Sequence, residues 1–302
     1  MGKRVLILGG TQYVGKELIN LLHAKGHSVT VAARGNFPFP LSSNINAIKF
    51  DRYDIDSFPK EFQSRWDIVI DQLSFYGEEA KIVVEYFKQF ATRFILTSSS
   101  AVYDSSNDCI EGCFAPGEYN YLESEGWEST EVVHGGSLYQ NGKRAAEAYY
   151  IQNSEYCSIV RFPQIFGIND LSNRLLELIL INKNKKNVYV DSKDKKHSLI
   201  HSRDAARFLS WLVDNDHNGP INACSNGIET TKGLVEKLGG DEKLIIENSK
   251  EILSIFKGKE VVLNADLAGR KGFIFEENDI WIDEVNRLWN YYINYIENFN
   301  SN

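Results

Sequence analysis

An apolar strand, a glycine-rich turn and an amphipathic helix follow one another at the start of this chain. Val5 to Leu8 form an unbroken apolar run, which is typical of a parallel strand covered on both faces. Residues 9–15 read GGTQYVG, and apolar residues then recur at helical spacing until Gly26. A unit of this kind lets the backbone approach the pyrophosphate of a dinucleotide at a helix N-terminus. The alternative is a tight turn that binds no ligand.

The alternation of strand and helix patterns continues through the first third of the chain. It predicts a parallel sheet with right-handed crossovers, which is a Rossmann-type doubly wound α/β fold. Ligands of such sheets bind at the carboxyl ends of the strands. The further strands are expected at residues 27–33, 47–50, 66–71 and 93–97, with a helix at 79–90.

The overall composition restricts the function classes. The chain has 302 residues and a net charge of −8 without an extended basic stretch, which argues against a nucleic-acid-binding protein. No apolar run approaches the ~20 residues that span a membrane, and the first residues show no signal-peptide pattern. The cysteines lack metal-site spacing, so we expect reduced thiols, no metal and a cytoplasmic protein. They are Cys109, Cys113, Cys157 and Cys224.

Tyr139 and Lys143 form a candidate pair for proton transfer. On a helix this spacing places the phenol and the ammonium on one face, about one turn apart. The ammonium would favour the phenolate and lower a tyrosine pKa that is normally near 10. The pair alone is a weak signal, because Tyr and Lys at this spacing also occur by chance on an ordinary surface helix.

Five short segments occur in the order that is typical of one enzyme superfamily. The segments are residues 9–15, Ser99–Tyr103, Tyr139–Glu147, Arg161–Gly167 and Ile200–Ala206. In these segments the chain resembles the extended branch of the short-chain dehydrogenase/reductase superfamily, the NAD-dependent epimerase/dehydratase group. The resemblance covers roughly residues 3–230.

The resemblance implies a catalytic role for three residues. Tyr139 would act as general acid/base, and Lys143 would lower its pKa and bind the nicotinamide ribose. Ser99, four residues before Tyr103, would hydrogen-bond the substrate oxygen. Hydride would pass between a substrate carbon and the nicotinamide. The expected activity is that of an epimerase or reductase acting on a hydroxyl or keto carbon of a sugar or nucleotide-sugar.

Two non-enzymatic functions are alternatives. A regulatory protein that binds NAD(P) without catalysis would be expected to have lost the tyrosine or the lysine, and both are present. An RNA-binding member of the atypical branch would be expected to have a basic face, which a chain of net charge −8 does not offer.

The ends of the second and third strands bear on the choice of cofactor. Ala33 stands where an acidic residue would hold the ribose of NAD, and Arg34 follows it. Asp51 and Arg52 follow the third strand and could flank the adenine, or they could form an ion pair within the loop. The pattern leans towards NADP over NAD. The predicted cofactor contacts are Gly9, Thr11, Gln12, Tyr13, Val14, Arg34, Asp51, Arg52, Lys143 and Phe162.

Several positions depart from the pattern of the superfamily. Gln12 replaces the usual middle glycine of the turn, so its side chain would lie beside the pyrophosphate. Ser100-Ala101 replaces the Asp-Glu of the 4,6-dehydratases, which argues against that reaction. Gln164 and His197 replace an Asn and an Arg that often contact the nucleotide of a nucleotide-sugar. The predicted substrate contacts are Ser100, Tyr103, Gln164 and His197.

The rest of the chain is expected to complete two domains. Residues 104–137 are predicted to form a loop or lid over the substrate site. Residues 1–165 and about 190–238 would form the dinucleotide-binding domain, and about 166–189 and 239–302 the substrate domain. A Trp- and Tyr-rich helix at 280–299 is interpreted as a core or homodimer contact. Further helices are expected at 171–181 and 204–213, and a strand and helix of the dinucleotide-binding core at 221–238.

Overall fold

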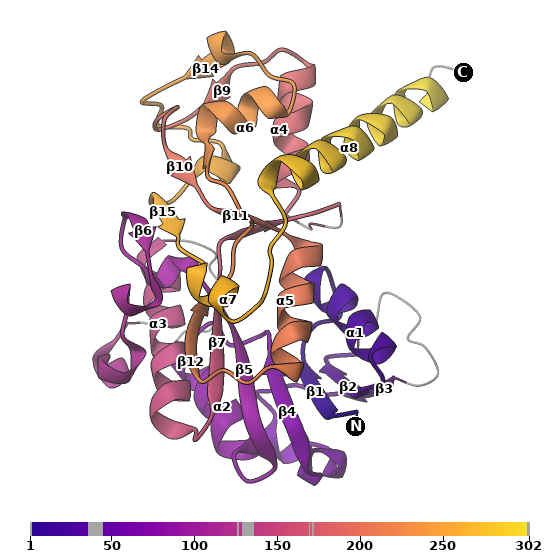
Figure 1. The fold of residues 1–302 in the computed structure, drawn as a ribbon, viewed down its shortest axis with the longest axis vertical. Coiled ribbons are helices and arrows are strands. Elements are labelled where there is room, and N and C mark those ends of the chain that lie inside the picture. The colour runs from indigo at the N-terminus through magenta and orange to yellow at the C-terminus, as the bar shows by residue number, and fades with distance from the viewer. Residues whose placement is uncertain are drawn as a thin grey trace.

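A parallel sheet of seven strands forms the larger lobe of the protein (Figure 1). The computed structural model describes residues 2–35, 45–125, 127–128, 136–168, 170 and 172–300. Its strands are ordered β12-β7-β5-β4-β1-β2-β3, which confirms the predicted Rossmann-type fold. The strands are β1 (Arg4–Leu8), β2 (Ser28–Ala33), β3 (Asn46–Lys49), β4 (Trp66–Asp71), β5 (Ala91–Ser99), β7 (Cys157–Phe162) and β12 (Gly219–Asn222).

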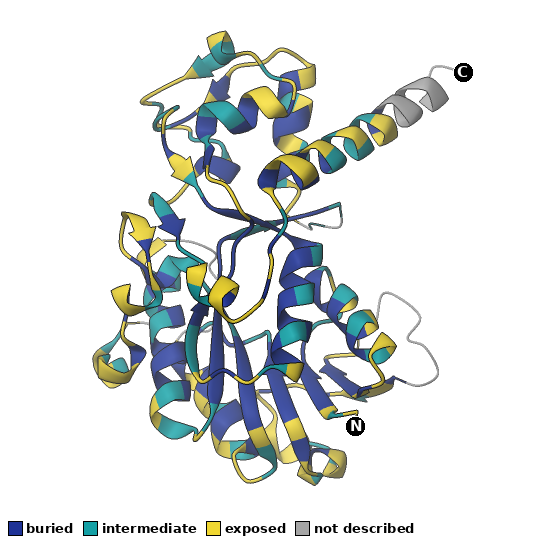
Figure 2. Ribbon diagram, viewed as in Figure 1, coloured by how far each residue is buried: buried dark blue, intermediate teal, exposed yellow. Residues whose placement is uncertain are grey.

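Helices cover both faces of this sheet. On one face lie α1 (Val14–Ala24) and α5 (Ser202–Asp214), and on the other α2 (Gly77–Phe87) and α3 (Gly136–Asn153). Except for β3, whose residues are mostly exposed, the strands are largely buried between these helices (Figure 2). Double-sided burial accounts for the continuous apolar runs in the sequence. The predicted bounds of β4 are confirmed, those of β1, β2, β3, β5 and β12 shift by one or two residues, and β7 was not predicted.

A smaller lobe has an apolar core of its own. Its helix α4 (Arg174–Lys183) starts three residues later than predicted. Its helix α6 (Thr231–Lys237) was expected in the dinucleotide-binding core, but Leu234, Val235 and Leu238 pack in this lobe instead. The short strands of this lobe are β9 (Val188–Tyr189), β10 (Lys196–His197), β13 (Glu229–Thr230) and β14 (Ile245–Ile246), and 3-10 turns span Glu242–Leu244 and Ser254–Phe256.

The C-terminal region is shared between the two lobes. Helix α7 (Asp266–Arg270) and the segment after it return to the larger lobe, where Phe273 and Phe275 join the core. Helix α8 (Asn278–Asn300) starts against the smaller lobe through buried Trp281 and then projects away from the body (Figure 1). No helix within the described ranges is both long and apolar enough to cross a membrane.

The insertion after the fifth strand is packed against neighbouring elements where it is described. Strand β6 (Ser106–Cys109) pairs with β15 (Val261–Leu263), and turns at Pro116–Glu118 and Tyr121–Glu123 lie on α3. Residues 126 and 129–135 of the predicted lid lie outside the described residues. A second strand pair, between β8 (Gln164–Phe166) and β11 (Leu199–His201), lies between the large sheet and the smaller lobe (Figure 1). Further 3-10 turns span Ile55–Ser57, Lys60–Gln63, Ser100–Val102 and Glu111–Cys113.

Candidate active site

The glycine turn brings the end of β1 into direct contact with α1. Gly9 and Gly10 have φ angles of +88° and +71°, which side chains rarely adopt. A Cβ on Gly15 would lie 2.2 Å from the Cα of Gly10, so glycine is required at this approach. Tyr13 also has a positive φ, of 51°, and this strained backbone precedes the first residue of α1.

The turn has the features of a site for the pyrophosphate of a dinucleotide. The backbone N–H groups of Thr11, Gln12 and Tyr13 donate to no acceptor within the described part of the chain. They lie at the N-terminus of α1, where the helix dipole favours negative charge. Gln12 is exposed and Thr11 is half-buried, so this part of the turn is accessible from solvent, whereas Val14 is buried.

Ser99 and Tyr139 come together at the carboxyl end of the sheet. Ser99 is the last residue of β5, and its side chain is hydrogen-bonded to the Tyr139 side chain, which comes from the first turn of α3. Burial raises the pKa of Tyr139, while the Ser99 hydrogen bond and the Arg174 charge act in the opposite direction. The side chains of two predicted catalytic residues therefore meet in one place.

Lys143 lies one turn further along α3 and is 4% exposed. Its Nζ donates to the carbonyl oxygens of Ser74, at 2.9 Å, and Thr97, at 3.2 Å. The ammonium also lies 4.4 Å from the centre of the Phe75 ring, whose centre is 6.2 Å from that of Tyr139. Burial lowers the pKa of Lys143 to about 8, although the Asp71 charge opposes this effect.

The basic residues expected near the adenine lie in two different environments. Arg34 is exposed at the end of β2. Arg52 is only 5% exposed, and its Nη2 lies 3.5 Å from Oδ1 of Asp71. Arg52 therefore forms an internal ion pair, with a carboxylate of β4 and not with Asp51. Asp51 is exposed and accepts a hydrogen bond from the backbone N–H of Tyr53.

The hydroxyl of Tyr103, a predicted substrate contact that follows β5, is fully engaged within the protein. Tyr103 is 1% exposed, donates to Oδ1 of Asn222 at 2.7 Å and accepts from Nη1 of Arg161 at 2.8 Å. The structure therefore gives Tyr103 a packing role. Ser100 is half-buried at the start of a 3-10 turn, and Phe162 is buried opposite Ser99 in the sheet register.

Gln164 and His197 both lie where the smaller lobe begins. Nε2 of Gln164 donates to the Ile255 carbonyl oxygen, while its buried Oε1 has no partner among the described residues. Nε2 of His197 lies 2.8 Å from Oγ1 of Thr231. Burial lowers the pKa of His197 to about 4, so its ring is neutral at neutral pH. A neutral ring could donate a hydrogen bond to a phosphate but could not attract it by charge.

Comparison with protein families gives a match over most of the chain. The family described as "NAD dependent epimerase/dehydratase family" matches residues 5–224. The chain belongs to this family.

The relatives of this epimerase/dehydratase-family chain are distant. The chloroplast stem-loop binding protein of 41 kDa b of Arabidopsis thaliana is 30% identical over 125 residues, which are 37% of this chain and 32% of that protein. The chain spans between 32% and 58% of the length of the curated relatives that it matches.

Solved structures resemble this family member over almost its full length. The epimerase Mth375 of Methanothermobacter thermautotrophicus has a TM-score of 0.71 at 18% identity, covering 98% of this chain and 95% of that one. MoeE5 in complex with UDP-glucuronic acid and NAD has a TM-score of 0.70 at 16% identity, covering 95% of this chain and 98% of that one. At this level of identity the resemblance shows the fold.

Two residues near the centre of this site were not predicted from the sequence. Arg174, at the start of α4, lies over the Phe166 ring at 5.5 Å and influences the pKa values of both Tyr13 and Tyr139. No local pattern marks this residue. Asp71 is fully buried, and a carboxylate that ends an apolar strand was a signal available in the sequence.

Proposed function

We propose that this protein is an NAD-dependent epimerase or reductase that acts on a hydroxyl or keto carbon of a sugar or nucleotide-sugar. The observation that carries the proposal is the hydrogen bond between Ser99 and Tyr139, with Lys143 one turn along the same helix. The N–H groups of the glycine turn, which have no acceptor among the described residues, would hold the pyrophosphate at the same edge of the sheet. A nicotinamide bound there would supply the exchange of hydride.

The roles of the three side chains follow from their positions. Ser99 would hydrogen-bond the reacting oxygen of the substrate and hold it beside the Tyr139 hydroxyl. Tyr139 would take a proton from that oxygen, or return one to it. Lys143 would bind the ribose of the cofactor and stabilise the phenolate by its charge.

NAD is the proposed cofactor because one of the two basic residues is already neutralised. Arg52 is buried against Asp71 and is not free to bind a 2′-phosphate. The predicted preference for NADP therefore depends on Arg34 alone. The family description, which names NAD, supports the same choice.

The test is the Tyr139→Phe variant. With NAD and UDP-glucose as probe substrate, we expect turnover to fall by at least ~100-fold, the scale of general acid/base catalysis. Tyr149→Phe is the matched control, since it makes the same change on α3 at a residue whose hydroxyl contacts Glu85. Turnover of Tyr139→Phe equal to that of this control would refute the proposed mechanism.

A second measurement separates an epimerase from a reductase. Mass spectrometry of cofactor released from the denatured protein identifies what the site retains during purification. Tightly held NAD favours an epimerase, which must regenerate its cofactor in each cycle. A protein that neither retains NAD nor binds it when it is added would favour a function outside this proposal.

A further inference from the structure

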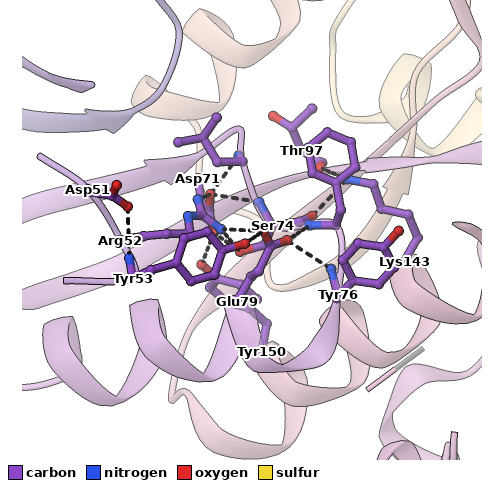
Figure 3. A network of polar contacts seen from close by, with 12 residues as sticks. Asp51, Arg52, Tyr53, Asp71, Ser74, Tyr76, Glu79, Thr97, Lys143 and Tyr150 are labelled. Carbon is purple, nitrogen blue, oxygen red and sulfur yellow. Dashed lines mark hydrogen bonds and ion pairs between the residues drawn. The ribbon is translucent and has the colours of Figure 1, made fainter. Parts of the chain in front are cut away.

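A buried carboxylate, Asp71, organises the loop that faces Lys143 (Figure 3). Its Oδ1 accepts hydrogen bonds from the backbone N–H groups of Leu73, at 2.8 Å, and Ser74, at 3.2 Å. Its Oδ2 accepts from the Ser74 hydroxyl and, at 2.8 Å, from the Tyr150 hydroxyl. These four donors come together on one side chain that is 0% exposed, and three of them belong to the loop after β4, so the position of that loop depends on Asp71.

A second buried carboxylate, Glu79, completes the fold of this loop. Its Oε2 accepts from the backbone N–H groups of Phe75, at 2.6 Å, and Tyr76, at 3.2 Å. Arg52 lies between the two carboxylates, with Nη2 3.5 Å from Oδ1 of Asp71 and Nη1 3.8 Å from Oε1 of Glu79. The loop is therefore fixed by two anions and one cation in the protein interior.

This loop presents the Ser74 carbonyl oxygen to Lys143, which donates to it at 2.9 Å. With the Lys143 ammonium included, the buried set has two negative and two positive charges. If Lys143 lost its proton, the set would retain one uncompensated negative charge, which is costly at a buried site. The charged form of the lysine thus completes the network.

The charges that act on Lys143 come from every element around it. Asp71 on β4, Glu79 on α2 and Glu147 on its own helix favour the ammonium, while Arg52 after β3 disfavours it. Burial has the largest effect and acts against the ammonium, and Asp71 is the strongest of the opposing charges. Glu147 is engaged by Arg161, which leaves Asp71 and Glu79 as the main anions.

We infer that Asp71 is a positioning residue, which holds the Lys143 ammonium in place through the Ser74 carbonyl and keeps it charged at neutral pH. The consequence for catalysis rests on the proposed function, but the effect on Lys143 does not. A purely structural role for Asp71 would affect the stability of the loop and leave the protonation of Lys143 unchanged.

The experiment is a titration of Lys143 followed by NMR of protein labelled with 13C at the lysine ε-carbons. The Lys143 signal is assigned by its loss in Lys143→Arg. In Asp71→Asn, which keeps the size of the side chain, we expect the pKa of Lys143 to fall by at least about one unit. Asp67→Asn is the control, because Asp67 is an exposed carboxylate at the other end of β4 that also accepts a backbone N–H.

A second variant keeps the test decisive if Asp71→Asn does not fold. Glu79→Gln removes the other carboxylate, and a smaller fall in the pKa of Lys143 is expected. A Lys143 pKa that does not fall in the folded variant, or variants, would overturn the inference. If the pKa falls as expected but the wild-type protein does not bind added NAD, the proposed function fails and the role of Asp71 stands.

Discussion

Replacing Glu147 by Gln tests whether a buried ion pair holds the insertion and the sheet together. Glu147 on α3 and Arg161 on β7 are both 0% exposed, and Nη2 of Arg161 lies 2.6 Å from Oε2 of Glu147. Nε of Arg161 is 3.1 Å from each carboxylate oxygen, and Ser98 also donates to Glu147. Although burial acts in the other direction, Glu147 raises the pKa of Arg161 above its ordinary value.

The size of the effect follows from what the substitution leaves behind. The Gln side chain has nearly the same shape, but Arg161 becomes a buried cation without its counter-charge. Removing one partner of a buried pair typically costs about 3–5 kcal/mol of the free energy of unfolding. For a domain of this size class, that loss corresponds to a decrease of roughly 6–20 °C in the midpoint of thermal unfolding.

The assay compares Glu147→Gln with Glu85→Gln in thermal and urea unfolding. Glu85 makes the same type of pair with Lys88, at 2.6 Å, but on the exposed side of α2, where a pair is worth about 1 kcal/mol or less. A destabilisation of Glu147→Gln no larger than that of this control would refute the argument. It would mean that the Arg161 charge is compensated by its carbonyl and hydroxyl partners alone.

Two further predictions concern the glycine turn and the buried histidines. Gly15→Ala places a Cβ 2.2 Å from the Cα of Gly10, and we expect at least ~10-fold weaker binding of NAD, measured by calorimetry. An unchanged affinity would contradict the assignment of the glycine turn as the NAD site. Burial lowers the pKa values of His197 and His201 from 6.5 to about 4, so the unfolded chain binds protons that the folded chain does not. The free energy of unfolding should therefore fall as the pH drops from 6.5 to 4, by about 1.4 kcal/mol per unit for each histidine. His197→Asn should reduce the slope in urea titrations, and an unchanged slope would argue against burial of the neutral ring.

The sheet could be predicted from the sequence because its signals are local. Apolar runs, turn glycines and helical spacing specify each strand and crossover, and the bounds of β4 were predicted without error. The smaller lobe was harder, because the apolar face of α6 is compatible with either core. Its position is set by contacts with α4, about fifty residues earlier in the sequence.

The insertion shows a similar limit. Its acidic and aromatic composition suggested a lid. In the structure, part of the described insertion is hydrogen-bonded to the buried side chain of Arg161. That guanidinium donates to the carbonyl oxygens of Glu111, at 2.8 Å, and Phe114, at 3.0 Å. Backbone acceptors carry no residue signature, so nothing in residues 104–118 could indicate that they cover a buried arginine. The packed arrangement thus depends on a residue some fifty positions away.

The motif of Tyr139 and Lys143 suggested a type of chemistry but not the charges that act on the two side chains. The spacing suggested that the lysine acts directly on the tyrosine, yet in the structure Tyr139 bonds to Ser99 and Lys143 to the loop fixed by Asp71. Burial raises the pKa of Tyr139, and Arg174, from the other lobe, is the cation whose charge opposes this rise. Because these partners come from β4, β5 and α4, the acid–base properties of the pair are a property of the assembled fold. A substitution far from the motif in sequence can therefore change the pH dependence of the site while leaving the motif intact.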